Sequence, residues 1–426
     1  MKSDDLSYLQ RILTNGIIHH SRRFLLVIDD AQEDICREDC HEWKSFLAPL
    51  KCAKSGSMVL VTTRSLKVAD HVGTVKPFVL EGLPEGVLWE FFRMHAFGSD
   101  NSDRNTVLAS IGRSMVSRLN GSPLGAKMLG RLLSLKHDPI YWRNILESEL
   151  WKLHHEEKEM MFTHEGEEKN SISPALKLSY QYLPFHLKRC MSFSSVYPRD
   201  YEFDAETLVD CWVAAGLVLP YGGMLALDVG HGYFQQLVNR SFFQKAPTSS
   251  RYIMHDLVYA MAQQISSNEC FVINNREDLS RIPPNVRHLS VLGSSGLKSS
   301  DLESLHMYKT LRSVICISMD SDIVTTSVAE TRFSDLVNIR MLRFISCQLK
   351  ELPENVGNLI HLRYLDISAC DFDKFPDSFW RLYKLEILDA RNCKIRDVPK
   401  GIIKLVNLQR VRLKDDLMRQ LGVCRV

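Results

Sequence analysis

Two adjacent carboxylates, Asp29 and Asp30, follow the apolar run FLLVI at residues 24–28. A short apolar run bounded by charge is typical of a parallel strand that is covered on both faces. Open α/β sheets place ligands at the carboxyl ends of such strands, and an aspartate there usually meets a metal ion or a water molecule. We therefore expect Asp29 and Asp30 to lie at a ligand-binding edge of a sheet.

A second apolar strand, GSMVLVTTRS at residues 56–65, ends in two threonines and Arg64. A guanidinium at a strand end near two carboxylates suits a phosphate sensor, because its planar set of donors matches a terminal phosphate. An ion pair that joins the two strand ends is an equally good interpretation of Arg64 taken alone.

Two further motifs lie at predicted helix starts. In GSPLGA, at residues 121–126, Pro123 lacks an N–H group, and by itself it indicates only the first position of a helix. In MHD, at residues 254–256, a histidine is more often a packed or capping residue than a ligand contact. We assign Met254 to the core and Asp256 to helix capping or to the orientation of His255.

The composition sets broad limits. The chain has 426 residues, enough for several domains, and its 53 Lys and Arg nearly balance its 51 Asp and Glu, which does not favour nucleic acid or an anionic membrane. Its 11 cysteines lack CxxC pairs and suit buried thiols in a reducing compartment. No apolar stretch reaches the roughly 18 residues of a membrane span. We expect an intracellular, cytoplasmic protein with no membrane span.

The C-terminal region repeats with a period of 23 residues from about residue 336. The period aligns leucine, cysteine and proline columns, which include Leu336, Leu359, Leu382 and Leu405; Cys347, Cys370 and Cys393; and Pro353, Pro376 and Pro399. Columns in phase predict leucine-rich repeats, each with a short strand, a cysteine at the bend and a looser convex segment after the proline. The stretch from Val286 to Ile317 resembles one or two degenerate repeats.

Strand alternation in these repeats separates core from surface. Leu365 is predicted to lie in the core, while the residues around it are predicted to point outward to a protein partner. These partner positions are Arg363, Tyr364, Asp366, Glu386, Ile387 and Asp389.

The segment YPRDYEFDAETLVDCWVAAGLV, at residues 197–218, predicts an N-cap at Asp204 and a helix with Leu208, Val209 and Trp212 on one face. It resembles a winged-helix domain. Its acidic residues would repel phosphates, so we expect packing within a switch rather than binding to nucleic acid. These residues are Asp200, Glu202, Asp204, Glu206 and Asp210.

The order of these blocks resembles the nucleotide-binding leucine-rich-repeat (NB-ARC) disease resistance proteins of plants. LLVIDDA is similar to the second kinase motif of that family, GSMVLVTTR to its arginine sensor strand, GSPLGA to its glycine-proline-leucine motif and MHD to its signature of the same name. The resemblance covers nearly the whole chain from Phe24 onward. It implies a switch that binds ADP or ATP with Mg²⁺ and is not primarily an enzyme.

The resemblance also implies roles for particular residues. Asp29 would hold Mg²⁺ and Asp30 would act catalytically by orienting the attacking water. Arg64, Gly121, Pro123, Leu124 and His255 would contact the nucleotide, with Pro123 on the adenine and His255 on the ADP phosphate. Met254, His255 and Asp256 would form the switch that holds the closed state.

The phosphate-loop pattern GxxxxGK[ST] is absent from the sequence. In the family this loop precedes LLVIDDA, so we expect a chain truncated before it. The strand that carries the loop normally lies between the LLVID and MVLVTT strands, so we also expect a central gap in this sheet. Without backbone N–H groups and a lysine for the phosphates, nucleotide binding should be weak.

The predicted fold is therefore a partial P-loop-type parallel α/β sheet, a helical domain, a winged-helix domain and a C-terminal leucine-rich-repeat solenoid. We place these domains at residues 1–82, 83–172, 173–275 and 276–426, with degenerate repeats to about 335. The predicted function is an ADP/ATP-controlled switch in plant innate immunity, whose repeats contact a pathogen effector or a guarded host protein and which is capable of self-association. The alternatives are a nucleotide-independent protein-binding repeat module and a winged helix that binds nucleic acid.

Overall fold

The computed structural model describes residues 14–15, 23–31, 41–48, 50, 53–98, 106–151, 173–293, 305–317, 336, 338–347 and 349–420. The described residues fall into two compact units, those up to Gly82 and those from Leu83 onward. None of the described helices is long and apolar enough to cross a bilayer.

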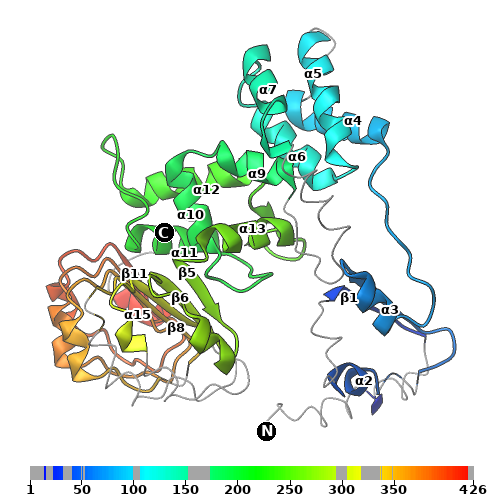
Figure 1. The fold of residues 1–426 in the computed structure, drawn as a ribbon. Helices are drawn as coiled ribbons and strands as arrows, with labels where there is room; N and C mark the ends of the chain where they lie inside the picture. The colour runs from blue at the N-terminus through cyan, green and yellow to red at the C-terminus, as the bar shows by residue number, and fades with distance from the viewer. Residues whose placement is uncertain are drawn as a thin grey trace. The chain divides into compact units, whose positions relative to one another are not determined.

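The first unit contains β1 (Leu25–Ala31), α2 (His41–Leu47), β2 (Met58–Thr63) and α3 (Leu66–Val72) (Figure 1). The two strands are direct parallel neighbours, with Leu25 opposite Met58 and Ile28 opposite Val61. The predicted gap between them is therefore wrong, because β1 and β2 satisfy each other's backbone groups. The prediction that β1 is covered on both faces is also wrong, since Leu25 is 61% exposed and Val27 is 54% exposed.

The second unit begins with a helical region. It consists of α4 (Glu85–Phe97), α5 (Thr106–Val116), α6 (Pro123–Leu133), α7 (Pro139–Leu146) and α9 (Pro174–Gln181). Aromatic side chains fill its core, with the ring of Phe92 edge-on to Trp142. Gly130 lets α6 approach α4 closely, because an added Cβ there would lie 3.1 Å from the carbonyl oxygen of Phe92.

The winged-helix region follows. Its elements are α10 (Phe185–Ser194), α11 (Ala205–Ala214), α12 (Ala226–Asn239), β3 (Gln244–Lys245), β4 (Tyr252–Ile253) and α13 (Asp256–Ser266). The N-cap prediction at Asp204 is confirmed, since its carboxylate accepts the Thr207 N–H at 2.9 Å. The predicted apolar face of α11 is buried, including Leu208, Val209 and Trp212.

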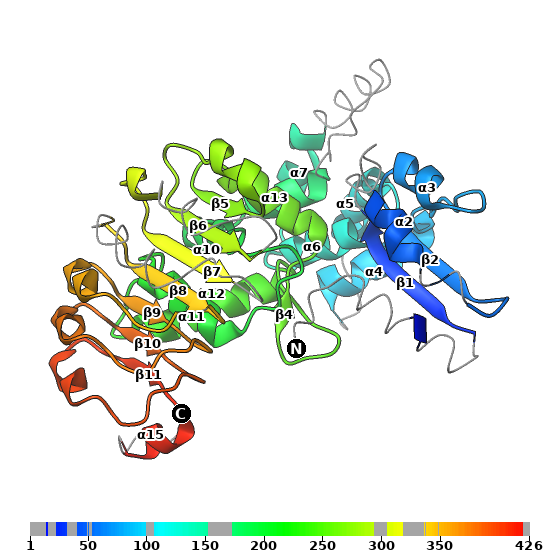
Figure 2. The same ribbon diagram turned by 90° about the horizontal axis from the view of Figure 1, so that it is seen from below.

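Within the described residues, the repeat region forms one parallel sheet of seven strands, which lie side by side in chain order in Figure 2. The strands are β5 (Cys270–Ile273), β6 (His288–Leu292), β7 (Ser313–Ile317), β8 (Met341–Ile345), β9 (Tyr364–Asp366), β10 (Ile387–Asp389) and β11 (Arg410–Arg412). A 3-10 helix η5 (Arg276–Arg281) follows β5, and α15 (Asp415–Gln420) follows β11. The sheet thus begins at Cys270, before the predicted start of the repeats at residue 276.

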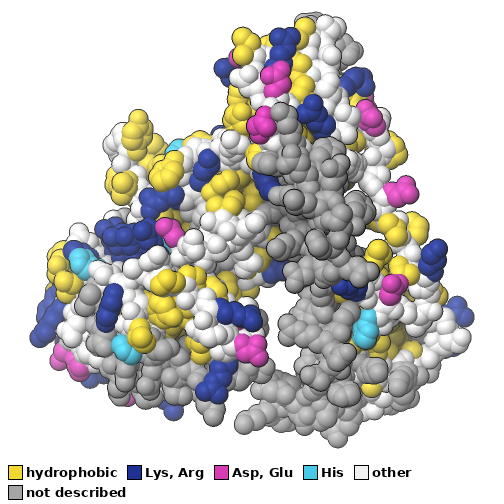
Figure 3. Space-filling view, viewed as in Figure 1, with side chains coloured by type: hydrophobic (Ala, Val, Ile, Leu, Met, Phe, Trp, Pro, Cys, Tyr) yellow, Lys and Arg dark blue, Asp and Glu magenta, His cyan; other side chains and the backbone are white. Residues whose placement is uncertain are grey.

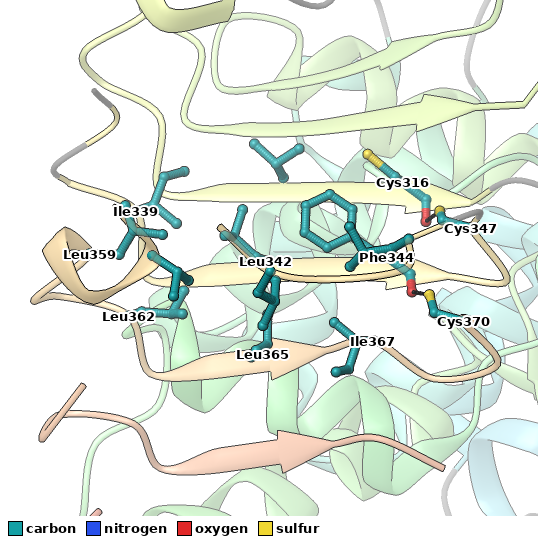
Figure 4. Packing of buried hydrophobic residues seen from close by; sticks show 14 of the residues in the cluster. Cys316, Ile339, Leu342, Phe344, Cys347, Leu359, Leu362, Leu365, Ile367 and Cys370 are labelled. Atoms are coloured by element: carbon teal, nitrogen blue, oxygen red, sulfur yellow. Dashed lines mark hydrogen bonds between the residues drawn. The ribbon is translucent and has the colours of Figure 1, made fainter. Parts of the chain in front are cut away.

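The 23-residue columns form the core of this sheet, as predicted. Leu342, Leu365 and Leu388 lie in register on β8, β9 and β10, and all three are buried. Figure 4 shows Leu342, Leu365 and their neighbours gathered on one side of the strands. The column prolines precede the 3-10 helices η8 (Glu354–Asn358), η9 (Asp377–Arg381) and η10 (Lys400–Lys404).

The cysteine column closes the bend after each strand. The Cys370 thiol donates to the Phe344 carbonyl at 3.1 Å, and the Cys393 thiol donates to the Ile367 carbonyl at 2.9 Å. One residue before each cysteine, the backbone is left-handed, with φ of 54° at Ser346, 57° at Ala369 and 60° at Asn392. The thiols therefore satisfy carbonyls of the preceding repeat while the chain turns sharply.

Candidate functional site

The two candidate carboxylates lie at the carboxyl end of β1. A bulge interrupts the pairing of β1 with β2 between Ile28 and Ala31, and Asp30 within it has a φ of 52°, which an aspartate tolerates better than most residues. The Asp29 carboxylate accepts a hydrogen bond from the Thr62 hydroxyl, whose oxygen accepts the Asp30 N–H at 2.8 Å. Within the described residues, no group of three or more His, Cys, Asp or Glu could hold a metal.

Arg64 lies at the end of β2 and pairs with Asp30. Its Nε and Nη2 atoms donate to the two Asp30 carboxylate oxygens at 3.1 and 3.3 Å. Both side chains remain open to solvent, with 38% of Arg64 and 19% of Asp30 exposed. The ion pair, which was one of the two interpretations of Arg64 from the sequence, is present. The role of Arg64 as a phosphate sensor stays a prediction.

The GSPLGA motif forms the start of α6. Ser122 is its N-cap and accepts the Gly125 N–H at 3.1 Å, while Pro123 occupies the first turn with its ring exposed. Gly121 has a φ of 75°, and its carbonyl accepts the Leu83 N–H at 2.9 Å. Leu124 packs against the winged-helix core. An exposed proline ring is free to pack on a planar base, and the adenine contact stays a prediction.

The MHD motif forms the start of α13. Met254 is buried, as predicted. His255, rather than Asp256, is the N-cap, because its Nδ1 accepts the Leu257 N–H at 3.3 Å. Asp256 is the first helical residue and pairs with Arg199, whose Nε lies 2.8 Å from its carboxylate. The prediction that Asp256 caps its own helix is wrong, and the sequence analysis did not identify Arg199.

A buried charge network, which the sequence analysis did not identify, joins the winged-helix region to the repeat sheet. Arg343 on β8 donates to the Asp366 carboxylate on β9 at 2.9 and 2.8 Å, and to the Tyr197 hydroxyl at 2.7 Å. Only 4% of Arg343 and 2% of Asp366 are exposed. Burial raises the pKa of the Tyr197 phenol well above its ordinary value, so the hydroxyl stays protonated and accepts from the arginine.

A second charge cluster lies nearby between α11 and the end of the sheet. The buried Asp210 carboxylate on α11 lies 2.9 Å from Arg410 and 2.7 Å from Arg412 on β11. Arg412 also lies 3.7 Å from Asp389, which pairs with Arg391 at 2.7 Å. In Figure 3, Lys and Arg side chains gather where the winged-helix helices meet the repeats. The acidic face predicted for α11 therefore meets arginines of the repeats.

The six predicted partner positions do not form an exposed surface. Tyr364, Asp366, Ile387 and Asp389 are buried, and Arg363 and Glu386 are half-buried and lie 3.6 Å apart. The alternation that turns Leu365 into the core does turn its neighbours to the other face of the sheet. That face, however, is covered, because Tyr364 and Ile387 belong to the same apolar cluster as α10 and α11.

The sequence does carry a signal for the buried network. Arg343, Asp366, Asp389 and Arg412 occupy one position of consecutive 23-residue repeats and are paired in register across four strands. The charges run positive, negative, negative, positive, so each carboxylate of the column has an arginine opposite it on one neighbouring strand. The periodicity therefore locates this column, although it does not reveal that another domain covers it.

Comparison with known protein families agrees with this arrangement. The chain matches the NB-ARC domain over residues 2–102, the disease resistance protein winged helix domain over 196–262 and a leucine-rich repeat region over 285–422. It is 35% identical over 276 residues to disease resistance protein RGA2 of Solanum bulbocastanum, covering 64% of this chain and 26% of that protein. It is 31% identical over 357 residues to putative disease resistance protein RGA1 of the same species, covering 83% of this chain and 32% of that protein.

The chain thus spans about a quarter to a third of the length of these curated relatives. Among solved structures, the LRR protein LIC12759 of Leptospira interrogans covers 35% of this chain and 38% of its own, at 21% identity and a TM-score of 0.28, a likeness too weak to bear on function. The matched domains follow the order NB-ARC, winged helix and leucine-rich repeats. This chain belongs to the NB-ARC leucine-rich-repeat family of plant disease resistance proteins.

Proposed function

We propose that this chain is part of a plant innate-immunity receptor and that its winged-helix and repeat regions form the closed state of an ADP/ATP-controlled switch. The observation that carries the proposal is the buried network of Arg343, Asp366 and Tyr197. A buried ion pair adds little net stability when intact, yet breaking it by removing one partner costs about 3 to 5 kcal/mol. Such a contact favours two distinct arrangements, one sealed and one fully separated, over a gradual loosening.

The Asp210 cluster supports the same proposal. Asp210 is buried against Arg410 and Arg412, so separation of α11 from β11 would expose three charges to water at once. Water would solvate these charges in the open state, which keeps the open state accessible to a signal. The two charge clusters together are suited to hold the regions in one register.

The nucleotide is ADP or ATP with Mg²⁺, by the family to which the chain belongs. The Asp29 carboxylate and Thr62 hydroxyl are oxygen ligands of the kind that Mg²⁺ prefers, and Arg64 offers donors to a phosphate. Pro123 and His255 would contact the adenine and the ADP phosphate, respectively. Because the sequence of 426 residues contains no phosphate-loop pattern, we expect weak binding and no turnover by this polypeptide.

The repeats would contact a pathogen effector or a guarded host protein inside the cell. In the sealed state the strand face around Tyr364 and Ile387 is buried, so a partner that reads this face must compete with the winged-helix region. Partner binding there and opening of the switch would then be coupled by mass action. The open form is proposed to self-associate.

A charge-reversal experiment tests the switch. In a chimera that supplies the phosphate loop and signalling domain of a relative, Asp210→Lys should place like charges against Arg410 and Arg412 and cause signalling without a trigger. The double variant Asp210→Lys with Arg410→Glu should restore silence in part, because it exchanges the charges of this pair and leaves Arg412 beside Asp389. Equal signalling by the parent and Asp210→Lys at equal protein abundance would remove this interface from the mechanism.

The MHD motif offers an independent test in the same chimera. Asp256→Val removes the partner of Arg199 at the start of α13 and should speed ADP release and cause signalling without a trigger. A coupling of about 1 to 3 kcal/mol would raise the open population several-fold to a hundredfold. Identical ADP off-rates for the two chimeras would leave this motif as a helix start only.

A second candidate function is a nucleotide-independent binding module. It is favoured by the Asp30 and Arg64 side chains, which already satisfy each other at 3.1 Å. Calorimetry with ADP separates the two candidates for the polypeptide of 426 residues. Submicromolar ADP affinity would contradict our expectation of weak binding and would also exclude the nucleotide-independent module.

A further inference from the structure

Four arginines form a column along the repeat sheet. Arg287, Arg312, Arg340 and Arg363 each occupy the position directly before a strand, from β6 to β9. Their backbones are bonded one to the next: Arg312 N–H donates to the Arg287 carbonyl at 2.8 Å, Arg340 to Arg312 at 2.8 Å and Arg363 to Arg340 at 2.7 Å. Neighbouring strands lie about 4.8 Å apart, so the arginines recur at about that spacing.

Acidic residues pair only with the two ends of this column. Arg287 lies 3.1 Å from Glu269 at one end, and Arg363 lies 3.6 Å from Glu386 at the other. Arg312 and Arg340, in the middle, form no ion pair with an acidic side chain in the part of the chain that the structure describes. Both are half-buried, so they are not simply solvated surface charges.

Among the residues that the structure describes, most of the charges around the central pair are positive, and Glu269 is the one acidic group that acts on Arg312. Burial is the main cause that lowers the pKa of both Arg312 and Arg340. The neighbouring arginines of the column and Arg189 on α10 lower it further. The guanidinium of Arg340 also lies against the turn that follows α11, since an added Cβ at Gly216 would be 2.7 Å from its Nη1. Like charges directly opposite on neighbouring strands destabilise a sheet.

We propose that this arginine column is a binding site for a compact soluble anion that carries at least two phosphate groups. Guanidinium groups bind phosphate oxygens in a bidentate manner, and an anion between Arg312 and Arg340 would remove the repulsion that the fold otherwise carries. The spacing of about 4.8 Å suits one phosphate for each rung of the column.

The ends of the column limit the size of the ligand. Glu269 and Glu386 flank the four arginines and would repel an anion that extended past them. Three steps of about 4.8 Å give a site of about 14 Å. A nucleic acid backbone continues its charge well beyond that length, so a small polyphosphorylated molecule fits better. The site lies wholly in the second unit and does not depend on the proposed nucleotide switch.

Calorimetry on the full chain with inorganic tripolyphosphate in magnesium-free buffer tests the proposal. The parent should bind tripolyphosphate at least about tenfold more tightly than inorganic monophosphate, because two rungs are engaged. The double variant Arg312→Gln with Arg340→Gln should lose at least about tenfold in tripolyphosphate affinity. The double variant Arg381→Gln with Arg396→Gln is the matched control, since it removes two charges from exposed positions of the repeats outside the column.

Two results would overturn the proposal. One is that the parent and the double variant of Arg312 and Arg340 bind tripolyphosphate with equal affinity. The other is that Arg64→Gln loses binding while that double variant retains it, which would place the anion in the first unit. If the chain binds vesicles that carry phosphatidylinositol bisphosphate but does not bind free tripolyphosphate, the ligand is a lipid headgroup, and the proposal of a soluble ligand is wrong.

Thermal melting without ligand gives a readout that a purely structural role would not produce. Arg312→Gln should melt at the same temperature as the parent or higher, because it relieves repulsion, and it should lose the stabilisation by tripolyphosphate that the parent shows. A lower melting temperature for Arg312→Gln with unchanged stabilisation by tripolyphosphate would make the column structural and overturn the site.

Discussion

The Asp30–Arg64 pair and the Asp366–Arg343 pair each join neighbouring parallel strands, and they differ in their access to water. Asp30 and Arg64 at the end of the β1–β2 pair are 19% and 38% exposed. Asp366 and Arg343 in the repeat sheet are 2% and 4% exposed. An exposed pair is typically worth 0 to about 1 kcal/mol, whereas removing one partner of a buried pair costs about 3 to 5 kcal/mol. The open pair can therefore exchange a partner for a ligand, while the buried pair commits the regions around it to one arrangement.

The same contrast holds for the two sheets as a whole. Leu25 on β1 is 61% exposed, whereas Leu365 on β9 is fully buried between its neighbours in the leucine column. Both strands are short and apolar, so their sequences alone do not distinguish them. What differs is the cover: the repeat sheet packs its leucines on one face and meets the winged-helix region on the other.

The largest expected effect comes from a charge in the leucine column. Leu365→Asp should lower the free energy of unfolding of the repeat region by about 5 kcal/mol or more, because it buries an unpaired carboxylate. Leu25→Asp, its matched control on the open sheet, should cost less than about 1 kcal/mol. Urea titration followed by circular dichroism measures both. If Leu365→Asp unfolds at the parent's midpoint, the register assigned to the repeats is wrong.

The second prediction compares the two ion pairs directly. Arg343→Met should lower the free energy of unfolding by about 3 to 5 kcal/mol, since Asp366 would remain buried without its cation. Arg64→Met should change it by less than about 1 kcal/mol. The double variant Arg343→Met with Asp366→Leu should recover most of the loss, because neither charge of this pair is then left buried without its partner. If Arg343→Met lowers the free energy of unfolding no more than Arg64→Met does, water reaches the Arg343–Asp366 pair.

Much of the repeat fold is predictable because its signal is repeated. The leucine column recurs at one step, the structure places Leu342, Leu365 and Leu388 in register, and the column prolines open the convex 3-10 helices. The N-cap at Asp204 is predictable for a local reason, since its carboxylate bonds an N–H only three residues away. Local chemistry and periodic packing are both readable from one sequence.

The candidate site is less predictable because it depends on contacts between distant segments. Arg199 and Asp256 are 57 residues apart, and Arg343 and Tyr197 are 146 apart, so nothing local connects them. The apolar run before Asp29 predicts burial, but among the described strands β1 pairs with β2 alone. The prediction of exposed strand positions around Tyr364 has the correct alternation of side chains. Their predicted exposure is wrong because the winged-helix region covers that face.

A third prediction uses pH to test how dry the repeat-side interface is. His288 on β6 is buried, lies 2.9 Å from the Ser313 hydroxyl and packs against the ring of Phe193 on α10. Burial, together with the arginines around it, lowers the pKa of His288 from 6.5 to about 3. Between these two values the unfolded chain binds a proton that the folded chain does not, so stability falls as the pH falls below 6.5.

The expected loss is about 2 kcal/mol between about pH 7 and pH 5. His288→Gln, which retains a partner for Ser313, should remove this part of the pH dependence. Urea midpoints of the parent and His288→Gln at both pH values measure the difference. Parallel losses for the two proteins would mean that His288 titrates normally and that water enters between α10 and β6.

The smallest effect concerns the left-handed bends, which both sheets use. Ala369 follows β9 with a φ of 57° and an exposed side chain, and Asp30 ends β1 with a φ of 52°. A non-glycine residue in the left-handed region destabilises the fold by about 1 to 2 kcal/mol. Glycine removes that cost, but it destabilises the fold by about 0.4 to 1 kcal/mol because it raises the entropy of the unfolded chain. Ala369→Gly should therefore stabilise the repeats by about 0.5 to 1 kcal/mol. Its N–H, which donates to the Arg391 carbonyl at 2.8 Å, is retained.

Asp30→Gly is the matched change on the open sheet, and it should gain less, because it also removes the partner of Arg64. Chemical unfolding at about pH 7 measures both variants against the parent. A stabilisation by Asp30→Gly as large as that by Ala369→Gly would mean that the Asp30–Arg64 pair contributes nothing to the resting fold. Arg64 would then already be available to an incoming phosphate. A loss of stability in Ala369→Gly would instead contradict the left-handed bend that carries each strand to its cysteine.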